Sequence, residues 1–362
     1  MKIRTTSIVL LLAAFFANAC LANEEYWEYT FRPGDSIWKI AKEHTTSVNN
    51  WSEIQRINNI AKGPDRTIQP GARIKIPIHM LKQQPVPATV VAVRGAVKVV
   101  RADGASATAT VGSHLYSGDQ VITTAAQSLR MQFADGSELQ VEAHSKIKLD
   151  KLSYHEKTGM VDTRVRLQQG RANTWVEKLK PKSRYQIQTP AAITAVRGTA
   201  YRLSSDENQI SRTEVTEGNV GVSAGGDTQQ VESGYGLVVE QGKPLSAPVK
   251  LLSAPGISDN QSRVHGQLEL AWTTLDGAAN YRYQLAQDAA FDLLVLNEST
   301  QQTKLKVSDL KPGDYFLRVR GIAANKLEGL NATRSFRIEP KPPNPGHAEK
   351  VIIPSGMLIL GQ

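Results

Sequence analysis

The sequence of 362 residues has little from which a covalent or metal-bound core could be built. It contains one cysteine, which excludes an intramolecular disulfide, a thiolate zinc cluster and an iron–sulfur site. Its seven histidines never occur at a metal-ligating spacing. No apolar run reaches the ~18 residues of a membrane-spanning helix. We therefore expect no metal, no cofactor and no transmembrane span, and a fold held by packing and hydrogen bonds.

Catalytic and nucleic-acid-binding patterns are missing as well. The sequence has no nucleophile elbow, phosphate loop or dinucleotide fingerprint, and no local motif arranges its Ser, His and Asp residues for catalysis. The 43 Lys and Arg residues outnumber the 34 Asp and Glu residues, for a net charge of +9, but the two signs are interleaved. Interleaved charge gives weak support for nucleic-acid binding. The sequence predicts a non-enzymatic protein with no nucleic-acid partner.

Residues 1–22 are typical of a secretion signal. Lys2 and Arg4 precede ten apolar residues, 8–17, a stretch too short to span a bilayer and of the length of a signal-peptide hydrophobic region. Removal of 1–22 takes away two positive charges and leaves 9 − 2 = +7. We expect a periplasmic mature chain, whose charge is compatible with anionic wall or lipid surfaces.

The single cysteine, Cys20, lies where this signal is expected to be cut, and two interpretations remain open. It could accept a lipid as the first residue of a bacterial lipoprotein, although Ala17 stands where such signals usually have Leu, Val or Ile. Cleavage after Ala22, which the small–x–small pattern Cys20-Leu21-Ala22 permits, would instead discard it, and we favour this interpretation because of the mismatch at Ala17.

Segments rich in proline and glycine divide the mature chain into three blocks, which indicates several domains. We predict a multidomain, mainly β protein. The predicted ranges are a small α+β module at 26–79, a linker at 80–88, a large all-β domain at 89–242, a linker at 243–256, a β-sandwich at 257–339 and a proline-rich tail at 340–362.

The first block reads as strand, helix, helix and strand. Residues 29–31 alternate as a strand, and Asp35 or Ser36 can cap the helix that follows. Ile37, Ile40 and Ala41 recur at helical spacing and predict its buried face.

Three segments of this block, 33–38, 58–60 and 70–77, resemble the LysM signature. The resemblance implies binding of N-acetylglucosamine-containing glycans, mainly peptidoglycan, in a shallow groove between two loops. The loop residues it implies are Gly34, Asp35, Ser36, Ile37, Asn59, Ile60, Ile68, Gln69, Pro70 and Gly71. Residues 61–66 make the second loop longer than usual. In the alternative interpretation the glycines and prolines only make turns, and Trp38 and Trp51 belong to the core.

The second block alternates apolar and polar residues, and Asp135-Gly136 marks a hairpin turn. Glycine recurs within strand patterns at Gly95, Gly170 and Gly218, where it indicates a bulge or a close backbone approach. We therefore expect stacked, coiled sheets and not one flat sheet.

Segments 117–119, 133–137, 196–199 and 215–220 of the same block resemble a FecR-type domain. Members of that family relay a signal from an outer-membrane receptor to a cytoplasmic sigma factor through a transmembrane helix, and no such helix is found in this sequence. The resemblance therefore implies a β domain that contacts other proteins. Arg197 could bind a carboxylate or phosphate ligand, but we favour a structural role within the β fold.

The third block has short alternating strands over about 80 residues, which is typical of a β-sandwich. Its spacing of Trp272, Tyr281 and Tyr315 resembles that of fibronectin type III-like domains, which mostly act as spacers or protein contacts. The whole sequence predicts a cell-envelope protein that binds peptidoglycan and presents β domains to other envelope proteins. The alternative is a periplasmic sensor or regulator that acts through the FecR-type block.

Overall fold

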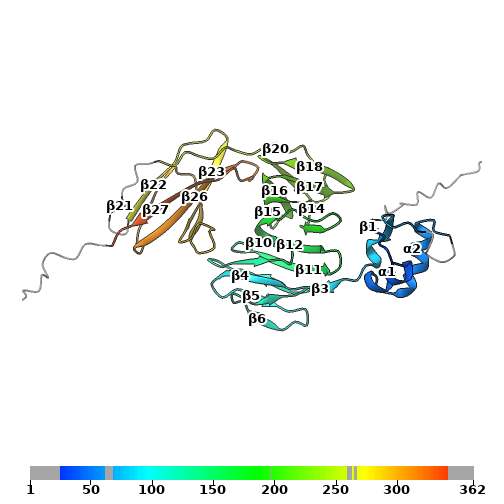
Figure 1. The fold of residues 1–362 in the computed structure, drawn as a ribbon. Helices are drawn as coiled ribbons and strands as arrows, with labels where there is room; N and C mark the ends of the chain where they lie inside the picture. Colours follow the sequence, from blue (N-terminus) through cyan, green and yellow to red (C-terminus); the bar gives the residue numbers. More distant parts are fainter. Residues whose placement is uncertain (1–24, 62–67, 197, 259–262, 265–266, 341–362) are drawn as a thin grey trace, which may run out of the picture. The chain divides into compact units, whose positions relative to one another are not determined.

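A computed structural model describes residues 25–61, 68–196, 198–258, 263, 264 and 267–340. The predicted signal peptide, Cys20, Arg197 and nearly all of the predicted tail lie outside the described residues. The chain divides between Lys82 and Gln83 into two compact units. Strands dominate, as predicted (Figure 1).

The first unit has the predicted order of strand, helix, helix and strand. Its elements are β1 (Tyr26–Thr30), α1 (Ile37–His44), a 3₁₀ turn (Val48–Asn50), α2 (Trp51–Ile57) and β2 (Arg73–Pro77). The two strands pair antiparallel, and both helices bury isoleucines beneath them. Trp38 and Trp51 are 50% and 39% exposed, so the alternative that placed them in the core is wrong. They fall outside the buried spacing set by Ile37, Ile40 and Ile54.

Most of the segment predicted as the linker 80–88 is structured. A 3₁₀ turn (Ile78–Met80) leads to Leu81, which is buried and bridges to Thr45. The next strand, β3 (Gln84–Pro85), pairs with the end of β11 in the second unit. Pro85 fits there because a two-residue strand at a sheet margin needs few backbone donors. Gln83 is therefore the single residue between the first unit and the first strand of the second.

The β domain consists of two sheets that share one strand (Figure 1). The first sheet runs β6 (Ser106–Thr108), β5 (Lys98–Val100), β8 (Gln120–Ile122), β11 (Lys146–His155), β12 (Met160–Val176), β13 (Arg184–Gln188), β14 (Ile193–Val196), β17 (Asn219–Ala224), β18 (Asp227–Glu232). The second runs β7 (His114–Leu115), β4 (Ala88–Arg94), β9 (Ser128–Gln132), β10 (Glu138–Val141), β12, β15 (Thr199–Ser205), β16 (Ile210–Glu217), β19 (Tyr235–Glu240), β20 (Val249–Lys250).

The shared strand β12 changes sheets at Gly170. Up to Gln169 it pairs with β11 of the first sheet, and from Gly170 onward it pairs with β15 of the second. Gly170 has a φ of +96°, and a Cβ there would lie 2.6 Å from the carbonyl oxygen of His144. Glycine is therefore required both by the backbone conformation and by the close approach, as its place in the strand pattern predicted.

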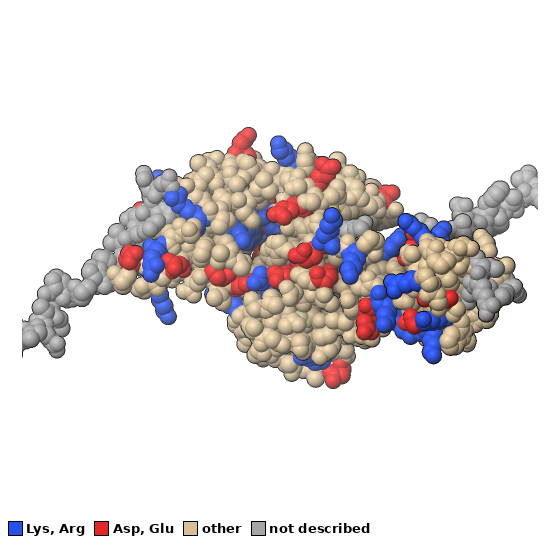
Figure 2. Space-filling model, viewed as in Figure 1, with Lys and Arg blue, Asp and Glu red and all other residues tan. Residues whose placement is uncertain are grey.

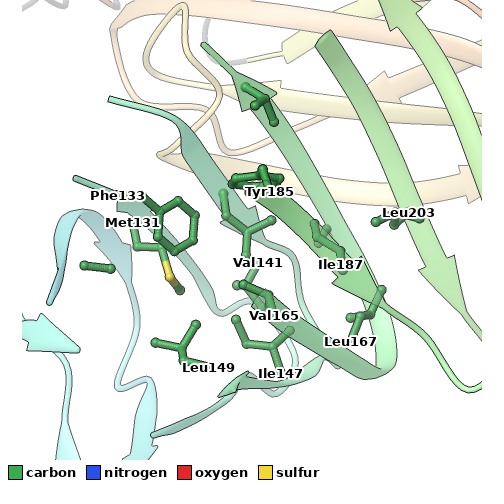
Figure 3. Packing of buried hydrophobic residues seen from close by; sticks show 14 of the residues in the cluster. Met131, Phe133, Val141, Ile147, Leu149, Val165, Leu167, Tyr185, Ile187 and Leu203 are labelled. Atoms are coloured by element: carbon green, nitrogen blue, oxygen red, sulfur yellow. The ribbon is translucent and has the colours of Figure 1, made fainter. Parts of the chain in front are cut away.

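The core of this domain lies between the two sheets, as expected for stacked sheets. Figure 3 shows Met131 and Val141 of the second sheet facing Ile147, Val165 and other apolar side chains of the first. Alternation along each strand sends these residues inward and the charged residues outward. The hairpin predicted at Asp135-Gly136 is present between β9 and β10.

The third block forms a sandwich of two sheets, as predicted. One contains β21 (Arg263–Val264), β22 (Gln267–Ala271) and β25 (Lys304–Val307), and the other β24 (Leu294–Thr300), β23 (Ala278–Ala286), β26 (Gly313–Ala323) and β27 (Ala332–Ile338). Trp272 packs with Tyr281 and Tyr283 in the shared core. The Tyr315 hydroxyl donates to the Lys311 carbonyl at 3.0 Å and fixes the corner before β26.

Two loops of the sandwich rest on the outward face of the second sheet. From one loop, the Phe291 carbonyl accepts a hydrogen bond from Gln140 at 2.9 Å, and Asp292 pairs with Arg130 at 2.6 Å. From the other, the carbonyl of Glu328 accepts from Arg202 at 2.6 Å. The segment predicted as the linker 243–256 is held too, because it contains β20 and because Leu252 accepts from Leu330.

The carboxylate of Glu328 lies at the centre of this contact. It accepts hydrogen bonds from Arg171 of the β domain and from Arg282 and Arg320 of the sandwich, and the Arg282 Nε to Oε1 distance is 2.7 Å. Glu328 and Arg320 are 4% and 2% exposed. A buried carboxylate is thus shared by arginines from both domains.

Replacing Glu328 by Gln should therefore destabilise the second unit strongly. Loss of the negative charge leaves buried arginines without compensation, and removal of one member of a buried charge cluster costs about 3–5 kcal/mol. Urea unfolding followed by tryptophan fluorescence, to which Trp175 and Trp272 of the second unit contribute, measures the change. The matched control is Glu269→Gln, because Glu269 pairs with Lys306 at 4.0 Å and both side chains are 59% exposed. Equal stability of the two variants would contradict the central role of Glu328.

Candidate functional site

The two loops predicted to form a groove lie next to each other at one end of the β1–β2 ladder. Beyond the last strand pair, Thr30 with Arg73, Phe31 N–H donates to the Ala72 carbonyl at 2.8 Å. The Phe31 carbonyl in turn accepts from Gly71 N–H at 2.8 Å. These bonds bring the loop that contains the predicted residues 34–37 beside the loop that contains 68–71.

The first loop is shaped by its own polar residues. Asp35 accepts hydrogen bonds from the Tyr29 hydroxyl at 2.7 Å and from Arg32 N–H at 2.8 Å. Burial disfavours the Asp35 carboxylate, but these two bonds outweigh it and lower the pKa of Asp35. Burial and the bond to Asp35 together raise the pKa of Tyr29 to about 12. Ser36 caps α1 by accepting from Lys39 N–H at 3.1 Å. Both predicted residues therefore hold the loop in place.

The predicted residues differ in what a ligand could reach. Gly34 and Gly71 are exposed, with φ of +82° and +93°, and no atom lies within 4 Å of the place where a Cβ would stand. A ligand can therefore approach the backbone at both positions. Asn59, Gln69 and Pro70 are exposed, and Ile60 and Ile68 are half-buried. Ile37 is fully buried, so it supports the loop from below and offers no surface to a ligand.

Asn58, absent from the predicted site, fixes the second loop. Its side-chain amide donates to the carbonyls of Ile54 and Lys75 at 2.8 Å each, and its oxygen accepts from Lys75 N–H at 2.7 Å. The side chain thus ties the end of α2 to β2. The following Asn59 has a φ of +52°, so the chain turns sharply into the loop. Asn58 is the first Asn of the 58–60 motif, which was the signal for its importance.

Basic side chains gather over this first unit. Figure 2 shows Lys and Arg interspersed with fewer Asp and Glu on the face in view. On the exposed side of α1, the Lys42 ammonium lies 5.1 Å from the centre of the Trp38 ring. Trp38 and Lys42 therefore form an exposed cation–π pair on this helix.

A second group of titratable residues lies buried where the sandwich meets the β domain. Glu142, Glu214 and Glu328 face Arg171, Arg202 and Arg320 around a cavity of about 10 Å³. That space admits about one water molecule and no substrate. Burial lowers the pKa of Arg320 well below its ordinary value and that of Arg282 to about 10. The group therefore acts as a structural charge network.

Within the described ranges, no group of His, Cys, Asp or Glu is arranged to hold a metal ion. Nor does any helix in this part of the chain have the length and apolar character needed to cross a membrane.

Comparison with protein families finds two domains in the predicted order. The LysM domain model matches residues 29–77, and the model described as FecR protein matches residues 119–221. The chain therefore contains a LysM domain followed by a FecR domain. Both are non-catalytic domains with binding or regulatory roles. LysM domains bind glycans such as peptidoglycan. No curated protein matches the chain.

Solved structures resemble parts of the chain distantly. An anti-sigma factor candidate from Parabacteroides distasonis is 14% identical over 36% of this chain and 59% of its own, with a TM-score of 0.31. The FN3tt structure is 20% identical over 25% of this chain and 98% of its own, with a TM-score of 0.22. The chicken CNTN1 FN1–FN3 domains are 11% identical over 71% and 98%, with a TM-score of 0.22. This chain thus spans 59% of the length of the first of these proteins. Because the TM-scores are low, the description of the fold rests on the observed strand pairing alone.

The charge network should make stability depend on pH through Glu142. Burial raises the pKa of this carboxyl, but Arg320, Arg282 and Arg171 outweigh burial and lower it from 4.5 to about 2. A carboxyl with a lowered folded-state pKa stabilises the fold above its unfolded-state value and loses that effect as the pH falls. The difference in unfolding free energy between the unaltered protein and Glu142→Gln should therefore be largest above about pH 5 and shrink toward pH 2.

Urea unfolding at several pH values measures this difference. The control is again Glu269→Gln, whose exposed carboxylate should give a small difference that changes little with pH. A difference for Glu142→Gln that grows as the pH falls would contradict the assignment.

Proposed function

We propose that this chain is a non-enzymatic protein of the bacterial cell envelope, which binds peptidoglycan through its LysM domain and presents its FecR domain to other envelope proteins. The observation that carries the proposal is the pair of loops held side by side by the Phe31 backbone. Their exposed residues offer backbone groups at Gly34 and Gly71 and side-chain amides at Asn59 and Gln69. These are groups that recognise the acetamido and hydroxyl groups of an N-acetylglucosamine chain.

The remaining expectations fit an exported protein without catalysis. The signal-like residues 1–22 support export to the periplasm, and Cys20 keeps lipid anchoring open as the alternative to a free mature chain. The buried charged residues are paired within the fold, and their cavity of about 10 Å³ is too small for a substrate. A binding role is therefore favoured over an enzymatic one.

The test is co-sedimentation of the full mature protein with purified peptidoglycan. The double variant Asn59→Gly and Gln69→Ala should bind about tenfold or more weakly, because it removes two hydrogen-bonding amides. Glycine at position 59 keeps the positive φ of this residue, so the loop can retain its shape. A variant that lacks residues 26–79 should not sediment at all.

The matched control is Thr46→Ala with Asn49→Ala, which alters two exposed polar residues of the same unit outside both loops. It should bind like the unaltered protein. Equal binding by the Asn59/Gln69 variant would exclude these loops as the glycan site, and sedimentation of the chain without 26–79 would move the site to another domain.

The FecR match favours a second candidate function, that of a periplasmic sensor or regulator. In that case the partner is a protein that contacts the β domain. Crosslinking in intact cells should then recover one dominant partner from the full chain, and the same partner from the chain without 26–79. Loss of that partner upon the deletion would show that the LysM domain, and not the β domain, brings the two together.

A further inference from the structure

The outward face of the first sheet carries an excess of positive charge. In β5, β8, β11 and β12, the residues Val99, Val121, Ile147 and Leu167 pair in register and are buried in the core. Because neighbours along a strand point to opposite faces, the alternate residues lie on the outside. The basic residues among them and on the adjacent β13 are Lys98, Lys146, Lys148, Lys151, Arg164, Arg166 and Arg184, which we call the basic face.

The acidic residues of the same strands do not balance this charge. Asp162 pairs with Lys151 at 2.7 Å and with Arg164 at 2.9 Å. Asp150 pairs with Arg166 at 3.0 Å, and Arg166 remains 46% exposed. Counting β12 only up to Gln169, where it leaves the first sheet, these strands carry seven basic and two acidic residues, which leaves 7 − 2 = +5 out of a mature charge of +7.

Three lysines of the basic face make no charge pair. Among the described residues, no carboxylate pairs with Lys98, Lys146 or Lys148. Lys98 and Lys146 are exposed and both lie opposite Ile122, one on each neighbouring strand. Lys148 lies opposite Arg166. Lys146 and Lys148 are about 7 Å apart along β11, since side chains on one face repeat every two residues. The lysines therefore form a compact group on one rigid surface.

The other sheet of the domain differs in this respect. Its outward face carries Arg171, Arg202 and Arg212, but these are paired with acceptors of the sandwich loops that cover it. The positive charges of that face are therefore bound by groups of the same chain. The charges of Lys98, Lys146 and Lys148 on the basic face are available to a partner.

The connection between the LysM domain and the sheet that carries the basic face is short in the chain. The first unit ends at Lys82, and β3 begins at Gln84 and pairs with β11, the strand that carries Lys146 and Lys148. One residue, Gln83, therefore separates the LysM unit from a strand that pairs with the Ser153–Tyr154 end of β11. Such a short connection gives a second contact on the same polymer a high effective concentration.

We propose that the basic face is a second binding surface for the polymer that the LysM domain binds, and that it recognises the carboxylates of the peptide stems. This inference rests on the proposed function. The sugar chain supplies neutral acetamido and hydroxyl groups to the loops, and the stems supply the negative charge that a surface of +5 complements. Contacts of this kind between exposed charges are screened by salt, so the contribution should disappear at high ionic strength.

The test uses the full mature chain with the substitutions Lys98→Gln, Lys146→Gln and Lys148→Gln. None of these side chains has a hydrogen bond or charge pair in the described part of the chain, so the fold should be kept, and an unchanged thermal unfolding midpoint checks this. At about 0.01 M salt, sedimentation with peptidoglycan should weaken about tenfold, and at about 1 M salt the two proteins should bind alike.

The matched control replaces three exposed lysines elsewhere, Lys250→Gln, Lys304→Gln and Lys311→Gln, with the same change in net charge. It should bind like the unaltered protein at both salt concentrations. Peptidoglycan whose carboxyl groups have been converted to amides should bind the unaltered protein as weakly as native peptidoglycan binds the basic-face variant.

The outcomes separate this inference from the proposed function. If the unaltered protein sediments and the basic-face variant sediments equally well at low salt, the second surface is wrong and the LysM site stands. If the unaltered protein does not sediment under any condition, both proposals fail. If the variant loses only binding to vesicles that contain phosphatidylglycerol, the basic face contacts a membrane and the wall-polymer assignment is wrong.

Discussion

Three arginines from two domains share the carboxylate of Glu328, and the arrangement of the second unit depends on burying that group. A buried charge is tolerated only when every partner is in place. Arg171 lies on the outward face of β12, and Arg282 and Arg320 lie on the neighbouring strands β23 and β26 of the sandwich. Satisfying one carboxylate therefore fixes the sandwich on the second sheet. The sandwich loops contact the second sheet and not the outward face of the first, where Lys98 and Lys146 are exposed and Lys148 is half-buried.

The sequence was most informative where a short pattern determines a local structure. Alternation predicted the strands, Asp135-Gly136 predicted a hairpin, and Gly170 predicted a close backbone approach. The change of sheets within β12 could not be predicted, because alternation marks inward and outward residues but not the identity of the neighbouring strand. For the same reason, the burial of polar residues such as Arg202 and Glu214 could not be predicted. Their burial depends on a domain more than 100 positions away in the chain, which no local pattern records.

The candidate site shows where a family signature and physical periodicity disagree. Ile37 belongs to the loop that the LysM resemblance assigns to glycan contact, yet its spacing with Ile40 and Ala41 places it on the buried face of α1. The structure follows the spacing. Asn58 shows the opposite case. Its motif could be recognised in the sequence, but its three hydrogen bonds, which tie Ile54 to the distant Lys75, could not. The groove is thus built from loops that the sequence identifies and from supports that only the fold reveals.

The contact between the sandwich and the β domain is made largely by charged and polar groups, and this has a consequence for the separated state. An apolar interface that opens exposes hydrophobic surface, through which molecules tend to aggregate. Here the surfaces released would be mainly arginines, glutamates and backbone carbonyls, which water solvates well, with a few apolar side chains such as Leu327 and Phe291. We therefore expect that this interface can open and re-form in solution without aggregation of the chain.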